Sequence, residues 1–151
     1  MKNAASPHSE LLEIVLLIAA WFGEHPHGIL QTREACLTSD EIERRPDAPL
    51  SPCIIAAGDD IWSPEEYMLL LDGHVVATAP EFDVALRMLF ASYFSFHICY
   101  AQEVSSTLEF IQRALFGINP DRGSKGKNGR TQVNKRVLNL FQRITESQWN
   151  I

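Results

Sequence analysis

Few side chains in this 151-residue chain have the type and spacing that catalysis needs. His97 and Cys99 form the one histidine–cysteine pair in a dense apolar stretch, and such a pair could act as base and nucleophile of a hydrolase. The two side chains point the same way only if the segment is extended, and they diverge on a helix. A packed histidine and a buried thiol suit the apolar surroundings better. We therefore predict no catalytic residue and keep a hydrolase-like enzyme as the weakest functional hypothesis.

Candidate metal ligands lack the spacing of familiar sites. His25 and His27 share a turn without a cysteine or carboxylate cluster beside them, which indicates a solvated loop. The one acidic cluster does not place its oxygens at alternate positions around a glycine bend, and its members are Asp59, Asp60, Glu65 and Glu66. A zinc site is a further hypothesis, with Cys36, Cys53, Cys99 and His97 as its ligands. Small buried hydrophobic residues fit three scattered cysteines better, so we predict no metal and no cofactor.

The cysteine usage and the apolar runs indicate where the protein works. Three cysteines far apart in sequence are typical of an intracellular protein with reduced thiols, cytoplasmic or nuclear. The apolar run from Leu11 to Phe22 has twelve residues, whereas a membrane span needs about 20. Because Glu13 interrupts that run, it predicts a buried amphipathic helix and neither a signal peptide nor a membrane partner.

One ion pair is a candidate binding feature. Glu109 and Arg113 lie four residues apart, on one face of a predicted helix. Such a pair on the surface contributes a few tenths of a kcal/mol. We interpret it as a surface ion pair, with recognition of a partner as the alternative.

A basic, glycine-rich segment is the strongest candidate for binding. Residues 1–120 hold 6 basic and 17 acidic side chains, whereas residues 121–151 hold 7 basic and 2 acidic ones. The candidate binding residues there are Arg122, Lys125, Lys127, Arg130, Lys135 and Arg136. Basic loops with glycine attract phosphate backbones, but no aromatic side chain is interleaved for base stacking. Nucleic-acid binding through residues 122–136 is therefore an alternative hypothesis, and a solvated linker is the simpler interpretation.

The elements that would position these residues form a small, mostly helical α+β domain. Asp72-Gly73 between two apolar runs predicts a β-hairpin over residues 67–78, because a type I′ turn needs positive φ at both central positions. Two helices should follow, over residues 81–97 and 103–116, and pack on the hairpin. Nearly every hairpin residue is apolar, so at least one strand should be buried on both faces.

Helices at the two ends and one short strand complete the predicted domain. Ser6 and Pro7 signal the start of an N-terminal helix that ends at Gly23. A capping-box pattern begins a short helix, with Thr38 or Ser39 as the cap and Glu41 or Glu43 as the acid that bonds back to the backbone. A proline-rich loop at 44–52 precedes a strand at 53–57. We divide the chain into a core domain at 1–120, a flexible loop at 121–132, and a C-terminal helix at 133–151 that docks on the core.

The segment from Thr107 to Lys127 resembles a known group. Its LEFIQR and GINP blocks, at 108–113 and 117–120, are followed by Gly123 and Lys125. With the Asp-Gly hairpin and the aromatic end, they resemble the C-terminal region of sterile alpha motif domain-containing protein 3-like proteins. This is a group of animal proteins that is abundant in fishes. The resemblance implies an accessory region of scaffold-like proteins. The sterile alpha motif pattern itself is not found here, so polymerisation through that motif is not implied.

Taken together, the sequence favours a non-enzymatic protein-interaction or scaffold-type domain. The dense aromatic pattern and the missing catalytic motifs support a protein partner or self-association. Nucleic-acid binding is the alternative, and the hydrolase-like enzyme is third.

Overall fold

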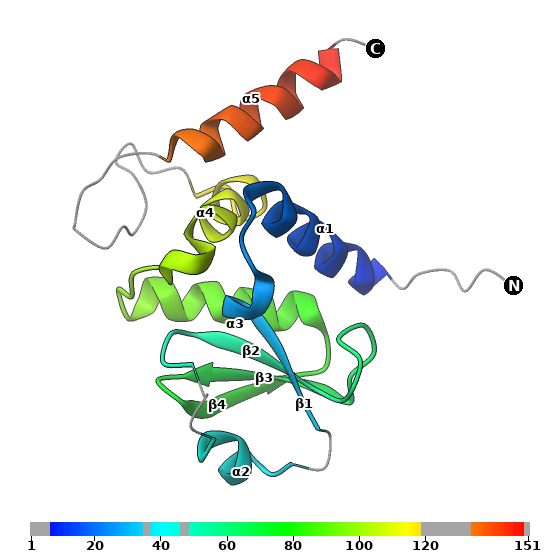
Figure 1. The fold of residues 1–151 in the computed structure, drawn as a ribbon, viewed down its shortest axis with the longest axis vertical. Coiled ribbons are helices and arrows are strands. Elements are labelled where there is room, and N and C mark those ends of the chain that lie inside the picture. The colour runs from blue at the N-terminus through cyan, green and yellow to red at the C-terminus, as the bar shows by residue number, and fades with distance from the viewer. Residues whose placement is uncertain (1–6, 35–36, 46–48, 119–133, 150–151) are drawn as a thin grey trace, which may run out of the picture.

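The computed structural model describes residues 7–34, 37–45, 49–118 and 134–149. Within these ranges five α-helices and a four-stranded mixed sheet form an α+β domain, as predicted (Figure 1). The helices are α1 (Pro7–Phe22), α2 (Ser39–Glu43), α3 (Phe82–Ser95), α4 (Ser105–Ala114) and α5 (Lys135–Trp149). The strands are β1 (Leu30–Arg33), β2 (Cys53–Ala57), β3 (Glu66–Leu71) and β4 (His74–Ala79). Two short 3-10 helices are η1 (Pro26–Gly28) and η2 (Gln102–Val104).

The sheet has the strand order β1-β2-β3-β4, with β1 parallel to β2 and the other neighbours antiparallel. The predicted hairpin is confirmed: Asp72 and Gly73 have φ values of 52° and 78°, the positive values that a type I′ turn needs. All five residues of β2 and the middle four of β3 are buried, so both central strands are covered on both faces. The Asp72-Gly73 turn sets the register of β3 and β4, which has one irregularity between Leu69 and Leu70.

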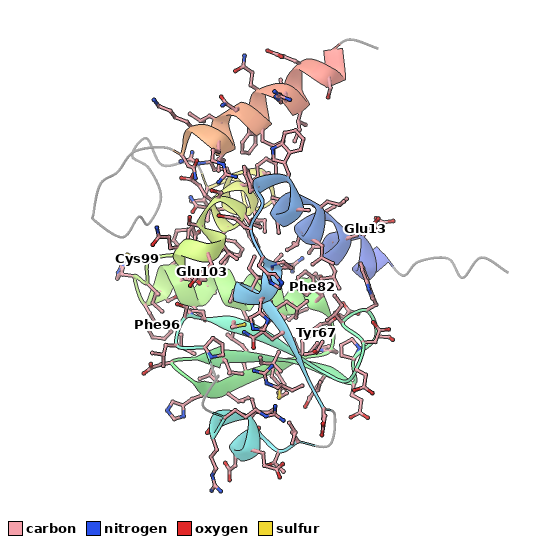
Figure 2. The ribbon with its side chains drawn as sticks, viewed as in Figure 1. Glu13, Tyr67, Phe82, Phe96, Cys99 and Glu103 are labelled. Carbon is pink, nitrogen blue, oxygen red and sulfur yellow. The ribbon has the colours of Figure 1, made fainter. Side chains whose placement is uncertain are left out.

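Different helices cover the two faces of the sheet. On one face Tyr67 of β3 packs edge-on against Phe82 of α3, with ring centroids 5.8 Å apart (Figure 2). On the other face Ile42 of α2 packs on a second cluster with Cys53, Ile55 and Leu70. The helix α2 begins with the predicted capping box, in which Thr38 and Glu41 bond each other's backbone N–H groups. These reciprocal bonds hold the carboxylate and lower the pKa of Glu41.

The remaining helices form a layer beyond α3. The helix α1 contacts both α3 and α4, and α5 contacts α4. Phe110 of α4 and Phe141 of α5 stack with centroids 4.8 Å apart, and Val137 of α5 is fully buried. Figure 1 shows α5 starting above α4, passing the C-terminal end of α1 and then leading away from the body, so that the two helices diverge. Only the first half of α5 carries buried residues among those whose side chains are described.

One strand was not predicted. Strand β1 has the sequence LQTR, which lacks apolar alternation, and its pairing with β2 defines it instead. The helix predicted over about 81–97 is observed as α3, which ends at Ser95 before the positive φ of 52° at His97. Ser6, residues 46–48 of the proline-rich loop and residues 119–133 lie outside the described part. No helix within that part is both long and apolar enough to cross a bilayer.

Candidate functional site

The predicted ion pair on α4 is present but buried. Arg113 Nη2 and Glu109 Oε1 are 3.5 Å apart, and the two side chains are only 6% and 5% exposed. The prediction that this ion pair lies on the surface was wrong, because eight consecutive residues of α4, from Ser106 to Arg113, are buried. The spacing of four residues correctly indicated that the two charges face each other, but packing by other helices decided their burial. A partner protein cannot contact an ion pair that is buried this deeply.

Polar and aromatic groups surround this buried pair. The Tyr100 hydroxyl donates to Oε1 of Gln112 over 2.7 Å, and Nε2 of Gln112 donates to the Ile118 carbonyl over 3.0 Å. Tyr93 packs edge-on against Tyr100, with centroids 4.9 Å apart. Burial raises the pKa of Tyr93 to about 12 and raises that of Tyr100 further, where the neighbouring Tyr93 and Glu109 contribute. Both phenols therefore stay neutral, and Tyr100 links Tyr93 of α3 to Gln112 of α4.

The basic candidates are only partly described. Arg122, Lys125, Lys127 and Arg130 lie outside the described residues. Lys135 is exposed in the first turn of α5. Arg136 donates a hydrogen bond to the Phe22 carbonyl and lies 5.3 Å from the centroid of the Phe22 ring. This cation at the C-terminal end of α1 is favourably placed against the helix dipole, so Arg136 has a structural partner inside the chain. Nucleic-acid binding by the segment stays a prediction.

A set of polar contacts, here called the polar clasp, joins the ends of three helices. It consists of Glu24, Ser106, Thr107, Asn134 and Arg136. The Glu24 carboxylate accepts hydrogen bonds from the backbone N–H groups of Ser106 and Thr107, at 3.2 and 2.7 Å. It therefore caps the N-terminal end of α4, where the helix dipole favours a negative charge. Asn134 accepts from the Arg136 N–H at 2.9 Å, which caps α5, and donates to the Ser106 hydroxyl at 2.9 Å.

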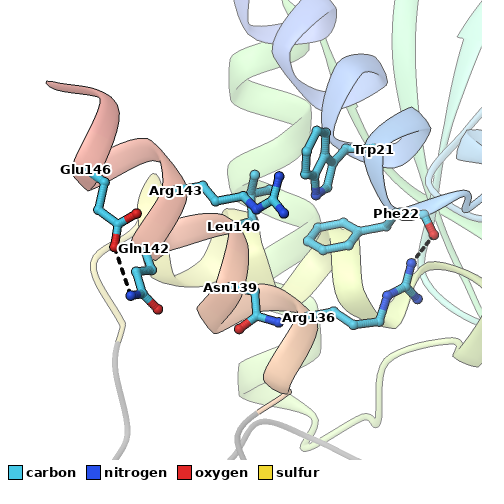
Figure 3. Close-up of a pocket in the computed structure, with 8 residues that line it drawn as sticks. All are labelled: Trp21, Phe22, Arg136, Asn139, Leu140, Gln142, Arg143 and Glu146. Atoms are coloured by element: carbon cyan, nitrogen blue, oxygen red, sulfur yellow. Dashed lines mark hydrogen bonds between the residues drawn. The ribbon is translucent and has the colours of Figure 1, made fainter. Parts of the chain in front are cut away.

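The polar clasp fixes a groove between the end of α1 and α5 (Figure 3). The groove has a volume of about 480 Å³. Trp21 and Phe22 of α1 form one wall, and Leu140, Arg143 and Glu146 of α5 are on the other. Figure 3 shows the Arg143 guanidinium extending over Trp21, and its carbon is 5.7 Å from the ring centroid. Because both walls are held at the clasped end, the groove is formed before any partner binds.

A row of large apolar side chains continues from this groove along the outside of α1. Ile14, Leu17 and Trp21 are 42%, 63% and 56% exposed. They are spaced by three and four residues, so they lie on one face of the helix. Ile144 of α5 is also exposed and belongs to the same helix face as the buried Val137 and Leu140. We call the groove and this row together the α1–α5 surface.

The charges on the α1–α5 surface are separated along α1. Glu10 and Glu13 are exposed beside the apolar row, toward the start of α1, and Figure 2 shows Glu13 pointing away from the body. Arg143 lies at the opposite end of the row, above Trp21. Within the described part of the chain none of these three charges has an ion-pair partner. The surface thus carries an acidic end and a basic end with apolar side chains between them.

The candidate catalytic and metal-binding residues differ in burial. Cys53 is buried, and burial raises the pKa of its thiol to about 12, which keeps it protonated. His97 and Cys99 follow the end of α3 and are exposed, which corrects the expectation of a packed histidine and a buried thiol. Among the described residues no group of three histidine, cysteine or acidic side chains could hold a metal, and Cys36 lies outside them.

A second cavity, of about 770 Å³, lies where η1, η2 and the loop before β2 meet. Its lining includes His25, His27 and Glu103. The His25 Nδ1 atom accepts from the His27 N–H at 3.1 Å, so one imidazole nitrogen is used to hold the turn. The buried Gln31 amide is also engaged, since it donates to the His27 carbonyl at 3.0 Å. The hydrogen bonds of His25 and Gln31 therefore hold the backbone of the turn at His27.

The exposed row on α1 was not expected, because the run from Leu11 to Phe22 was interpreted as a buried amphipathic helix. Val15, Ile18 and Phe22 are buried as that interpretation requires, whereas Ile14, Leu17 and Trp21 are exposed. The signal for the second face was available, because an amphipathic surface helix has one apolar stripe and this helix has two.

Comparison with family models, with curated proteins and with solved structures finds no match to this chain.

Proposed function

We propose that this protein is a non-enzymatic protein-interaction module and that the α1–α5 surface is its binding site. The observation that carries the proposal is the row of Ile14, Leu17 and Trp21, exposed on the outside of a helix whose other face already fills the core. Contiguous apolar patches on soluble proteins mark interaction sites more often than scattered single residues do.

The shape of the surface supports a helical ligand. A groove flanked by apolar side chains at spacings of three and four residues suits the apolar face of an amphipathic helix. Trp21 and Arg143 are residue types that often dominate binding energy at interfaces. Their stacking restricts both side chains before binding, which lowers the entropy lost when a partner docks.

The resemblance to an accessory region of sterile alpha motif proteins supports the same class of function. It rests mainly on the LEFIQR and GINP blocks at 108–113 and 117–120, which precede the clasped start of α5 along the chain. In the proposal α4 is the buried support of the site, and α1 and α5 contact the partner.

Affinity capture with matched variants tests the proposal. Tagged wild-type protein, Leu17→Glu and Leu138→Glu would be expressed at equal levels, and captured proteins compared by quantitative mass spectrometry. Leu138 is a suitable control because it is an exposed leucine of α5 outside the groove lining. We expect Leu17→Glu to lose captured proteins that Leu138→Glu retains. If both variants capture the same set as wild type, the α1–α5 surface is not the binding site.

A further inference from the structure

We propose that the α1–α5 surface binds a second copy of this chain, with the two α1 helices packed antiparallel about a two-fold axis near Leu17. This inference rests on the proposed function, because it names the occupant of the same surface. A symmetric dimer uses one surface patch twice, so the patch must be complementary to itself under a half-turn.

The apolar row meets this requirement. Ile14, Leu17 and Trp21 have the alternating three- and four-residue spacing of a helix–helix seam. With Leu17 at the axis, each copy places Ile14 on one side of the centre and Trp21 on the other. The half-turn then brings Ile14 of one copy beside Trp21 of the second copy, so a small side chain faces a large one at both ends.

The charges are self-complementary in the antiparallel arrangement only. Glu13 and Trp21 each lie four residues from Leu17, about 6 Å along the helix axis at 1.5 Å per residue. The half-turn therefore places Glu13 of each copy beside Trp21 of the other, where Arg143 extends over the ring. Two symmetric ion pairs would form between groups that have no ionic partner within the described part of one chain. A parallel arrangement would instead bring the two acidic ends together.

The groove between α1 and α5 lies beside the exposed row of α1, so both are accessible to this partner. Figure 1 shows that the two helices diverge along their lengths. Ile144, exposed on the diverging part of α5, adds apolar area on the same side. Four apolar side chains and two charges per copy make a modest interface, so we expect dissociation in the micromolar range.

Sedimentation velocity over about 1 to 200 μM protein tests the inference. Wild-type protein and the matched control Leu138→Glu should both pass from monomer to dimer within this range. Leu17→Glu should stay monomeric throughout, because each dimer would bury two carboxylates at its centre. Circular dichroism establishes that each variant is folded.

Charge exchange tests the antiparallel geometry. Glu13→Arg places two arginines at each end of the dimer, and Arg143→Glu places two glutamates there. Each single variant should raise the dissociation constant about tenfold or more, and the double variant Glu13→Arg/Arg143→Glu should recover most of the loss. Loss in the single variants without recovery in the double variant would overturn the antiparallel pairing.

The remaining outcomes separate this inference from the proposed function. Wild-type protein that is monomeric up to about 200 μM overturns the second-copy inference. The proposed function survives that result if Leu17→Glu still loses captured proteins. A dimer that Leu17→Glu leaves intact also overturns the inference, because the contact then lies on another face.

Discussion

Two regions of the molecule share one apolar core but differ in the contacts that are added to it. The sheet side, which comprises β2, β3 and α3, adds a continuous backbone ladder to apolar side chains that are almost fully buried. The helical side, which comprises α1, α4 and α5, adds polar side chains that bond helix ends. Glu24 bonds to α4 across 82 and 83 residues of sequence, and Arg136 bonds to α1 across 114.

This difference explains why the proposed binding site lies on the helical side. Hydrophobic packing is non-directional, so it needs apolar surface on every element that takes part. The sheet side buries nearly all of its apolar surface in this way. Polar contacts at helix ends fix the angle between helices while leaving the rest of each helix face uncovered. The polar clasp therefore allows Ile14, Leu17 and Trp21 to remain exposed without loss of order.

The largest effect should come from breaking the buried ion pair on the helical side. Arg113→Met leaves the Glu109 carboxylate buried without its guanidinium, and we expect a loss of about 3–5 kcal/mol in the free energy of unfolding. In the double variant Glu109→Leu/Arg113→Met, the loss should be smaller than the sum of the two single losses. Denaturant unfolding of all four proteins measures this coupling. A loss below about 1 kcal/mol for Arg113→Met would mean that the pair behaves as an exposed one.

The next effect compares one substitution in both regions. Leu89 of α3 is fully buried in the main core, whereas Leu17 of α1 is exposed. Leu89→Ala should lower the free energy of unfolding by about 2–5 kcal/mol because it leaves a cavity. Leu17→Ala should change it by less than about 0.5 kcal/mol. Urea unfolding at about 1 μM protein, where we expect a monomer, makes the comparison. Equal losses would show that Leu17 is packed within the chain.

A smaller effect should follow from opening the polar clasp. Glu24→Ala removes the acceptor for two backbone N–H groups at the start of α4, and we expect a loss of about 1–3 kcal/mol. Glu24→Gln keeps one acceptor oxygen and should lose less. Hydrogen exchange should accelerate at the amides of Ser106 and Thr107. As a control, Glu65→Ala removes an exposed carboxylate and should have almost no effect. Unchanged exchange at both amides would argue against the capping role.

The smallest expected effect is a change in how the free energy of unfolding depends on pH, and it comes from the buried Cys53 thiol on the sheet side. The pKa of Cys53 is raised from 9.0 to about 12, so the unfolded thiol ionises first as the pH rises. Its contribution to stability is complete below pH 9 and should fall by about 1.4 kcal/mol per pH unit above that, up to the folded pKa. Cys53→Val keeps a similar volume without the thiol, and its stability should fall less steeply between pH 9 and about 10. Equal slopes in urea unfolding would contradict a raised pKa.

Much of the sheet side could be predicted because its signals are local. Asp72-Gly73 selects one turn type, and that turn sets the register of β3 and β4. The strand Cys53–Ala57 was predicted with its observed bounds, and Thr38 and Glu41 form the capping box that their spacing indicated. Strand β1 could not be predicted, because only its partner β2 supplies the hydrogen bonds that make LQTR a strand.

The sequence by itself determined the hairpin and the helices, because these depend on residues a few positions apart. It also determined that Glu109 and Arg113 face each other, since four residues make about one helical turn. Only the tertiary structure decided that this pair is buried, that Arg136 bonds to α1, and that the second apolar row of α1 stays exposed. The physical reason is that burial and helix-end contacts depend on which distant elements pack together, and local periodicity carries no information about that choice.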